Sequence, residues 1–204
     1  MWLCVFGVAA RSVTHDLVNS SRSFHTDWAG DDMDTGQVEV DRSLVVRRLR
    51  ADDVDVFRKV RLDALEESPD AFGETLQDAR TADWQLRTNS GALFADRAVF
   101  IAIADSLPVG MVFVKCASHP ETAFLGGMWV RPEFRRRGLG RSLVQDGLDF
   151  LRKADQTELS LWVTHDHVDV FAFYRSLGFR ETGVTDTLRP GSNLLIHELR
   201  YSLR

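Results

Sequence analysis

An arginine-rich turn with two glycines is the part of the chain whose residue types and spacing most clearly suggest chemistry. Residues 135–142 follow an apolar run that ends at Val130 and precede an amphipathic segment. A helix that begins here points unpaired backbone N–H groups and the positive end of its dipole at one spot. Glycines let a ligand approach the backbone closely, and guanidinium groups bind pairs of phosphate oxygens. The pattern predicts a site for a phosphate or pyrophosphate.

Two well-known phosphate loops do not fit this turn. The dinucleotide-binding loop Gly-x-Gly-x-x-Gly needs a third glycine, where this chain has Leu143. The triphosphate-binding loop needs a lysine directly after its last glycine, where this chain has Arg141. The pattern that remains is Arg135-x-x-Gly138-x-Gly140. An ordinary strand–turn–helix with a basic, solvent-exposed face is the alternative interpretation.

A second group of residues follows in the segment 161–179. An apolar run ends in Trp162 and Val163, and His167 lies in the short polar stretch after it. The next residues have helical spacing, contain Tyr174 and end at Gly178. Glycine after the last helical residue is a common helix terminator, so a strand–loop–helix unit is predicted here.

Taken together, the two motifs resemble those of the GNAT superfamily of N-acetyltransferases. The family's acyl-CoA pyrophosphate loop is Gln/Arg-x-x-Gly-x-Gly/Ala. Its second motif is Leu-x-Val, a short loop, Asn-x-x-Ala-x-x-x-Tyr and a closing Gly-Phe. This chain has His167 where the family usually has the Asn that helps to hold the pantetheine arm, and Val170 where Ala is usual. The resemblance covers residues 43–204.

The resemblance implies acetyl-CoA as donor, no metal, and a primary amine of a small molecule or protein as acceptor. It implies one catalytic residue, Tyr174, which would protonate the leaving thiolate. The residues expected to bind the donor are Met128, Val130, Arg135, Arg136, Arg137, Gly138, Leu139, Gly140, Arg141, Ser142, His167 and Phe173. A backbone N–H near Met128 or Val130 would polarise the acetyl carbonyl. Tyr174 could instead be a core residue, because it has helical spacing with Val170 and Phe171.

The proton acceptor for the amine stays unassigned. Some family members place a carboxylate in the strand before the loop, but residues 122–130 contain none. Glu66, Asp70, Glu74 and His119 are other options, each more typical of a solvated surface group. A terminal α-amine, with a pKa of about 7.7–8.0, would need less help than a lysine side chain. The segment 67–74 lies where the family commonly builds its acceptor site.

Hydrophobic periodicity predicts the elements that must position these residues. Residues 99–104 and 109–115 form a predicted hairpin, and a helix after residue 53, capped by Asp52 or Asp53, ends before Pro69. The other predicted strands are 44–49, 123–130, 158–163 and the last strands at Phe179 and 194–201; the other helices are 82–87, a helix beginning at 139, and 168–177. This order is typical of an α+β domain with a mixed α/β sheet. The GNAT resemblance further implies a mostly antiparallel sheet, flanked by helices, with a central parallel and splayed pair, 123–130 and 158–163.

Composition and charge argue against several classes of protein. The 204 residues carry a formal net charge of −5, which argues against nucleic-acid binding. No apolar run approaches the ~18 residues of a membrane span. Only Cys4 and Cys116 are present, which favours a reducing, cytoplasmic location. Residues 1–42 lack sustained periodicity and predict a disordered extension before a domain at 43–204, with Met33 as a plausible alternative start.

Three functions remain open at this point. The first is an N-acetyltransferase that works by direct attack in a complex of both substrates. The second is a non-catalytic GNAT-like module that senses acyl-CoA, and the third is another phosphate-ligand protein such as a nucleotide binder. Related domains often dimerise, so a homodimer is possible.

Overall fold

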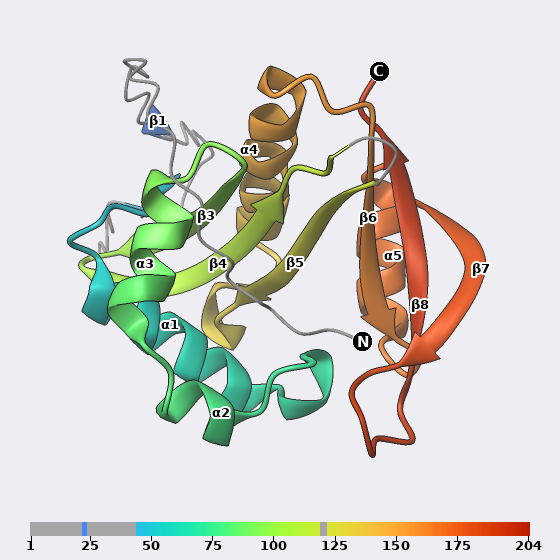
Figure 1. Cartoon of the computed structure of the whole chain (residues 1–204), viewed down its shortest axis with the longest axis horizontal. Helices are drawn as coiled ribbons and strands as arrows, with labels where there is room; N and C mark the ends of the chain where they lie inside the picture. The colour runs from blue at the N-terminus through green and yellow to red at the C-terminus, as the bar shows by residue number, and fades with distance from the viewer. Residues whose placement is uncertain (1–21, 24–43, 119–121) are drawn as a thin grey trace, which may run out of the picture.

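A computed structural model of the chain describes residues 22–23, 44–118 and 122–204 (Figure 1). Apart from residues 22–23, the predicted N-terminal extension lies outside this part, as does His119. Residues 22–23 form a strand, which the prediction of a disordered extension did not include. Arg22 and Ser23 pair antiparallel with Val46 and Val45 at the start of the domain.

One eight-stranded sheet organises the fold, with the strand order β1-β2-β3-β4-β5-β6-β8-β7. The strands are β1 (Arg22–Ser23), β2 (Leu44–Arg48), β3 (Arg97–Ala104), β4 (Leu107–Lys115), β5 (Ala123–Val130), β6 (Glu158–Thr164), β7 (Arg180–Thr187) and β8 (Leu195–Ser202). Every neighbouring pair is antiparallel except β5 and β6, which run parallel. The predicted mixed sheet with one central parallel pair is therefore confirmed.

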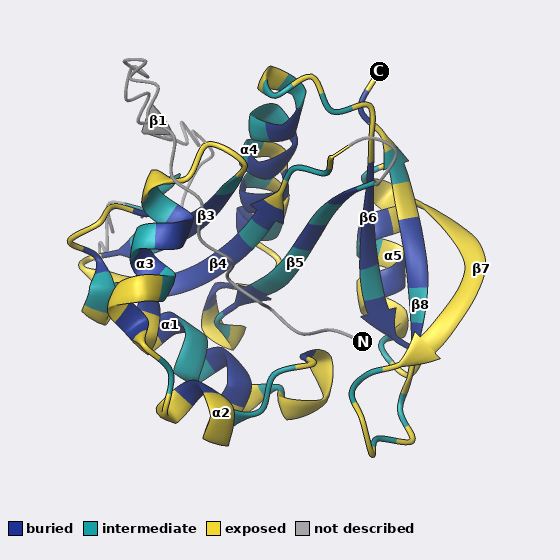
Figure 2. Ribbon diagram, viewed as in Figure 1, coloured by how far each residue is buried: buried dark blue, intermediate teal, exposed yellow. Residues whose placement is uncertain are grey.

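Helices cover both faces of this sheet. They are α1 (Val54–Glu67), α2 (Leu76–Arg80), α3 (Trp84–Leu93), α4 (Leu139–Lys153) and α5 (Val168–Ser176), with short 3₁₀ turns η1 (Pro69–Ala71) and η2 (Pro132–Phe134). In Figure 1, α1, α2 and α3 lie on one face, and α4 and α5 lie on the other. Figure 2 shows that the edge strand β7 is exposed along its length, whereas the central strands are largely buried.

Alternate residues of the central strands serve two separate cores. Val99 and Ile101 of β3 pack with α1 and α3, and Phe100 and Ala102 of the same strand belong to the core that includes α4 and α5. Successive side chains of a strand point to opposite faces, so both faces must be apolar. This explains why the central strands have continuous apolar sequences rather than alternating ones.

The parallel pair separates almost as soon as it forms. β5 and β6 pair only at Ala123 with Leu159 and at Phe124 with Ser160. Further along, β5 carries a bulge in which Gly127 and Met128 lie opposite the single residue Val112 of β4. Gly127 has φ 61°, a left-handed conformation that glycine adopts without strain. A wedge therefore opens between β5 and β6 toward their carboxyl ends, as the GNAT resemblance implied.

Two local predictions differ from the structure. Asp53 occupies the N-cap position of α1, but its carboxylate makes no capping bond. It instead accepts hydrogen bonds from Arg47 at 2.8 Å and from the Arg50 N–H at 2.7 Å, because a nearby guanidinium competes for it. Helix α2 was not predicted; Thr75 and Asp78 form a reciprocal capping box at its start.

Candidate active site

The wedge between β5 and β6 holds a cavity of about 760 Å³. Its walls come from both strands, from the turn before α4, from the first part of α5 and from residues 68–72 after α1. Of the residues predicted from the sequence, those lining it are Met128, Val130, Arg135, Arg136, Gly138, Gly140, Arg141, His167, Phe173 and Tyr174. The cavity does not include Arg137, Leu139 or Ser142 among its lining residues.

The turn before α4 has the backbone geometry of an anion site. Arg136 and Gly138 both have positive φ, 61° and 79°, and Gly138 is the N-cap residue of α4. The Ser142 N–H donates to the Gly138 carbonyl at 3.1 Å. The N–H groups of residues 139–141 precede that bond, and these are the helix N–H groups that have no partner within a helix. They lie at the positive end of a long helix next to the cavity.

The two glycines of the turn have different structural roles. A Cβ added at Gly138 would have no neighbour within 4 Å, so this glycine is required by its backbone conformation. A Cβ at Gly140 would lie 2.9 Å from Met128 Cε and 3.4 Å from Phe173 Cζ. Gly140 therefore lets the first turn of α4 pack against two side chains that line the cavity, a packing role that the motif alone did not predict.

The four arginines of the turn do not act alike. Arg136 and Arg141 line the cavity and are exposed. Arg135 folds back onto the protein: its Nε donates to the Val130 carbonyl at 2.8 Å and its Nη2 to Glu67 at 2.8 Å. The Arg137 guanidinium lies 5.7 Å from the centre of the Phe134 ring. The side chains best placed for a ligand anion are therefore those of Arg136 and Arg141.

Glu67, the last residue of α1, connects the turn to β5. Its carboxylate accepts hydrogen bonds from Trp129 Nε1 at 2.9 Å, from Arg135 and from the Ser68 hydroxyl. Desolvation of the carboxylate raises its pKa, but these three hydrogen bonds outweigh it and the net pKa is lowered. Glu67 is a structural hub that the sequence did not reveal, because two of its three partners, Trp129 and Arg135, are distant along the chain.

Tyr174 lies in the cavity wall and is only 4% exposed. Its ring packs edge-to-face against Phe173 and Phe179. Within the described part of the chain, no hydrogen bond to its hydroxyl is found. Burial raises the pKa of Tyr174, so the phenol stays protonated at neutral pH. The residue is thus part of the hydrophobic core and also part of the cavity wall.

His167 occupies the N-cap position of α5 and lines the cavity. Its backbone is fixed from both sides: the N–H donates to the Thr164 carbonyl at 3.1 Å, and its carbonyl accepts from Phe171 at 3.1 Å. The position therefore places a side chain reliably at the cavity wall. An imidazole there can donate or accept one hydrogen bond in its neutral form.

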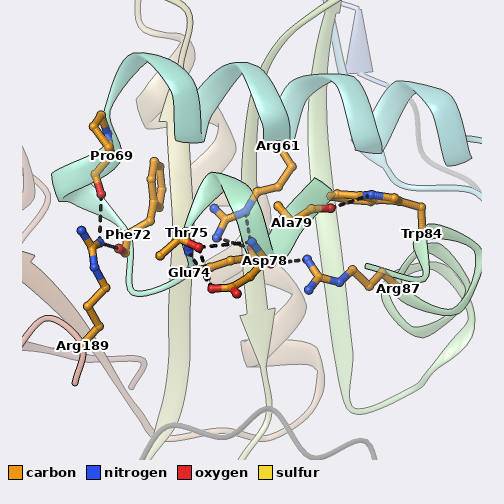
Figure 3. A network of polar contacts seen from close by, with 10 residues as sticks. All are labelled: Arg61, Pro69, Phe72, Glu74, Thr75, Asp78, Ala79, Trp84, Arg87 and Arg189. Atoms are coloured by element: carbon orange, nitrogen blue, oxygen red, sulfur yellow. Dashed lines mark hydrogen bonds and ion pairs between the residues drawn. The ribbon is translucent and has the colours of Figure 1, made fainter. Parts of the chain in front are cut away.

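The carboxylates considered from the sequence are not in the cavity wall. Glu74 bonds Arg61 at 3.0 Å and Arg87 at 2.6 Å on the α1–α2 side of the sheet (Figure 3). Asp169 is the carboxylate that does line the cavity, and it was not singled out from the sequence. No cluster of three potential metal ligands occurs among the residues that the structure describes. In the same residues, no helix is long and apolar enough to cross a membrane.

Comparison with known proteins points to one family. A model described as the acetyltransferase (GNAT) family matches residues 58–179. An uncharacterized N-acetyltransferase of Methanocaldococcus jannaschii is 24% identical over 149 residues, 70% of this chain and 63% of that protein. The chain thus spans less than two thirds of the length of this relative.

Solved structures share the fold at low sequence identity. A GNAT-family acetyltransferase from Streptococcus pneumoniae aligns with a TM-score of 0.66 and 14% identity, over 78% of this chain and 98% of that one. The PaiA N-acetyltransferase of Thermoplasma acidophilum, solved in complex with coenzyme A, aligns with a TM-score of 0.58 and 21% identity, over 78% of this chain and 99% of that one.

Proposed function

Because the chain belongs to the acetyltransferase (GNAT) family, we propose that it transfers an acetyl group from acetyl-CoA to a primary amine. One observation carries the proposal: a single cavity is lined both by residues of the turn before α4 and by the buried Tyr174. That combination provides a grip for a charged carrier and a proton for its leaving group. The acceptor is a small molecule or an exposed amine of a protein.

The donor end of the cavity suits coenzyme A. Arg136, Gly138, Gly140 and Arg141 line the same cavity, and we propose that the two guanidinium groups and the N–H groups at the start of α4 hold the pyrophosphate. The pantetheine arm would lie along β5, whose edge is unpaired with β6 beyond Phe124. Strand-like addition of an extended arm to such an edge is a common way to bind a ligand. Acetyl-CoA, as the co-substrate, would supply the acetyl group as an activated thioester and leave as the free thiol.

The β5 backbone also offers a donor for the acetyl carbonyl. The Arg131 N–H donates to the Val109 carbonyl at 2.8 Å, toward β4. Strand residues alternate in direction, so the polar backbone groups of Val130 face the wedge instead. Arg135 already occupies the Val130 carbonyl, and the Val130 N–H is therefore our candidate oxyanion donor. Donors of this type contribute about 2.7–4 kcal/mol to transition-state stabilisation.

Tyr174 completes the reaction. The amine nitrogen forms a bond to the acetyl carbon, the carbon–sulfur bond breaks, and the Tyr174 hydroxyl gives its proton to the departing sulfur. The amine loses a proton to solvent or to a group that we leave unassigned. His167 and Asp169 are the side chains in the cavity wall that could accept this proton. An α-amine has a lower pKa than a lysine side chain, so it would give up its proton to either group more easily.

The decisive experiment measures free thiol released from acetyl-CoA in the presence of a panel of amines that includes peptides and small molecules. Amine-dependent thiol release, with an acetylated product detected by mass spectrometry, supports the transferase. Coenzyme A should also protect the protein against heat better than ATP or NAD does. Stronger protection by ATP or NAD would instead support a nucleotide binder.

A second candidate is a module that binds acyl-CoA without turnover, and His167 favours it. This residue stands where the GNAT pattern has an Asn that holds the pantetheine arm. Tight acetyl-CoA binding with no thiol release across a broad panel would favour the sensing module over the enzyme. In either case the reducing, cytoplasmic setting expected from two cysteines agrees with acetyl-CoA as the ligand.

A further inference from the structure

Part of the cavity wall is a short segment between α1 and α2, residues 68–73. Ser68, Ala71 and Phe72 of this segment line the cavity. The segment is not a regular helix; it contains only the single 3₁₀ turn η1. A segment of this kind has few internal hydrogen bonds, so contacts from elsewhere must fix its position.

Those contacts come from the far half of the sheet, beyond the wedge. The Nη1 of Arg189 donates to the Pro69 carbonyl at 3.1 Å and to the Phe72 carbonyl at 2.9 Å, as Figure 3 shows. Its Nη2 lies 3.8 Å from the Asp70 carboxylate. The Thr164 hydroxyl, at the end of β6, donates to the Asp70 carbonyl at 2.8 Å. Two residues thus bond three of the segment's carbonyl groups.

The loop that carries Arg189 is itself braced. The Leu188 N–H donates to the Leu194 carbonyl at 2.9 Å, and the Ser192 N–H donates to the Arg189 carbonyl at 3.0 Å. Ser192 also accepts from the Leu194 N–H at 3.1 Å through its hydroxyl. The guanidinium is therefore presented from a fixed loop between β7 and β8, where its Nη1 bonds two carbonyls and its Nη2 lies near the Asp70 carboxylate.

We infer that Arg189 is a positioning residue that sets the acceptor end of the active site. This inference rests on the proposed transferase function. Arg189 closes the splayed sheet on the side away from the donor: it bonds the segment 68–73 and contacts none of residues 135–141. Removal of the Arg189 side chain should let the segment move away from Thr164. This movement would widen the part of the cavity that binds the amine and leave the turn at residues 135–141 unchanged.

The test compares Arg189→Ala with Arg189→Lys and with the control Arg175→Ala. Arg175 is also an arginine paired with a carboxylate, Glu181, but it is an exposed residue of α5 and its hydrogen bonds go to Glu181 and not to the segment. For Arg189→Ala we expect the acceptor KM to rise about tenfold, the effect of losing one or two charged hydrogen bonds. The acetyl-CoA KM should stay within about twofold in the same assay. Lysine keeps the charge but has one nitrogen in place of Nη1 and Nη2, so it should restore the acceptor KM only in part.

A second measurement tests, without turnover, whether Arg189 holds the segment 68–73 in place. Hydrogen–deuterium exchange of the unliganded protein should show faster exchange for residues 70–73 in Arg189→Ala and not in Arg175→Ala. Unchanged exchange there would overturn the inference, and so would equal rises in both KM values. Absence of turnover in the unmodified protein would overturn the proposed function instead, and with it the proposal that Arg189 shapes the binding site for the amine. The exchange result distinguishes that outcome from the case in which Arg189 does not hold the segment 68–73.

Discussion

The two walls of the cavity are built in opposite ways. The turn at residues 135–141 is exposed at Arg136, Gly138 and Arg141, which line the cavity, and of these side chains Arg141 donates one hydrogen bond to Ser176 at 3.4 Å. The segment 68–73 already has its carbonyls bonded, by Arg189 and Thr164. The first wall is ready to receive a charged ligand, whereas the second is held in a fixed shape. A site that accepts one common donor and one selected acceptor would need this division.

The difference also lies in how each wall is encoded. The turn depends on glycines and arginines within a few residues of each other. The segment depends on Arg189, which is 120 residues from Pro69 along the chain. Local conformational requirements constrain residue type at fixed positions, but a long-range hydrogen bond to a backbone carbonyl constrains only the residue that donates it.

The largest expected effect is at the open wall. Gly138→Val should abolish protection by coenzyme A and reduce activity by more than about a hundredfold, because a β-branched residue is severely strained at a φ of 79°. Gly183→Val is the matched control: Gly183 has φ 82° and no neighbour within 4 Å of an added Cβ, but it lies in β7. Isothermal titration with coenzyme A measures the difference. Equal losses in both variants would mean that the strain acts through folding and not through the turn.

Tyr174 lines the cavity from α5, outside both the turn and the segment 68–73, and its substitution should affect rate alone. Tyr174→Phe should lower kcat about 10²–10³-fold, the range of a general acid, with coenzyme A affinity nearly unchanged. Tyr201→Phe is the control, because its hydroxyl bonds Arg152 at 3.1 Å and not the cavity. Steady-state kinetics and a binding titration on the same preparations decide this. A normal kcat in Tyr174→Phe across pH would remove its role as acid.

The arginines of the open wall should separate by position. Arg141→Ala should weaken coenzyme A binding about tenfold, as expected for a charged hydrogen bond to a phosphate. Arg137→Ala should change it by less than about twofold, because the Arg137 guanidinium lies over Phe134 and outside the cavity wall. Titrations at two salt concentrations check both values. Equal effects would show that the turn acts only through its total charge.

A smaller effect is expected at the closed wall. Thr164→Val removes the hydroxyl that bonds the Asp70 carbonyl and should cost about 1 kcal/mol of unfolding free energy, the usual value of one hydrogen bond. The acceptor KM should rise a few-fold in the same direction as for Arg189→Ala. Urea unfolding and initial rates test it. A larger effect on acetyl-CoA than on the acceptor would contradict the division between the walls.

The smallest expected effect is a change in the free energy of unfolding with pH, which is absent at neutral pH and grows gradually in alkaline solution. Burial raises the pKa of Tyr174, whereas an unfolded tyrosine ionises near pH ~10. Its contribution to stability is therefore complete below that pH and is lost as the pH rises above it, by about 1.4 kcal/mol per pH unit. Urea unfolding at pH 9, 10 and 11 should show this decline in the unmodified protein and not in Tyr174→Phe. Parallel declines would show that Tyr174 is not the titrating group.

Much of the fold followed from local patterns. The hairpin of β3 and β4, the strand–turn–helix of β5 and α4, and the unit of β6 and α5 matched their predicted ranges closely, because apolar periodicity and flanking glycines define them. Helix α2 was missed, since its five residues are too short to show a period. Its Thr75–Asp78 capping box was the signal that could have revealed it.

The site was predictable only in part. The motif identified Arg136, Gly138, Arg141, His167 and Tyr174, all of which line the cavity. It could not show that Arg135 bonds Val130 and Glu67, because the choice between a ligand and a neighbouring carboxylate depends on where α1 packs. The bonds of Arg189 were hidden for the same reason.

The brief contact between β5 and β6 has a mechanical consequence. The two sheet halves share only two register pairs, so the backbone seam between them is short, and the remaining cohesion comes from side chains on α4 and α5 and from the bonds of Arg189 and Thr164 to the segment 68–73. The extended arm of a bound thioester would lie between the unpaired edges of β5 and β6 like an additional strand and connect the two halves of the sheet. We expect the unliganded protein to loosen first along this seam, and the occupied protein to melt as a single cooperative unit.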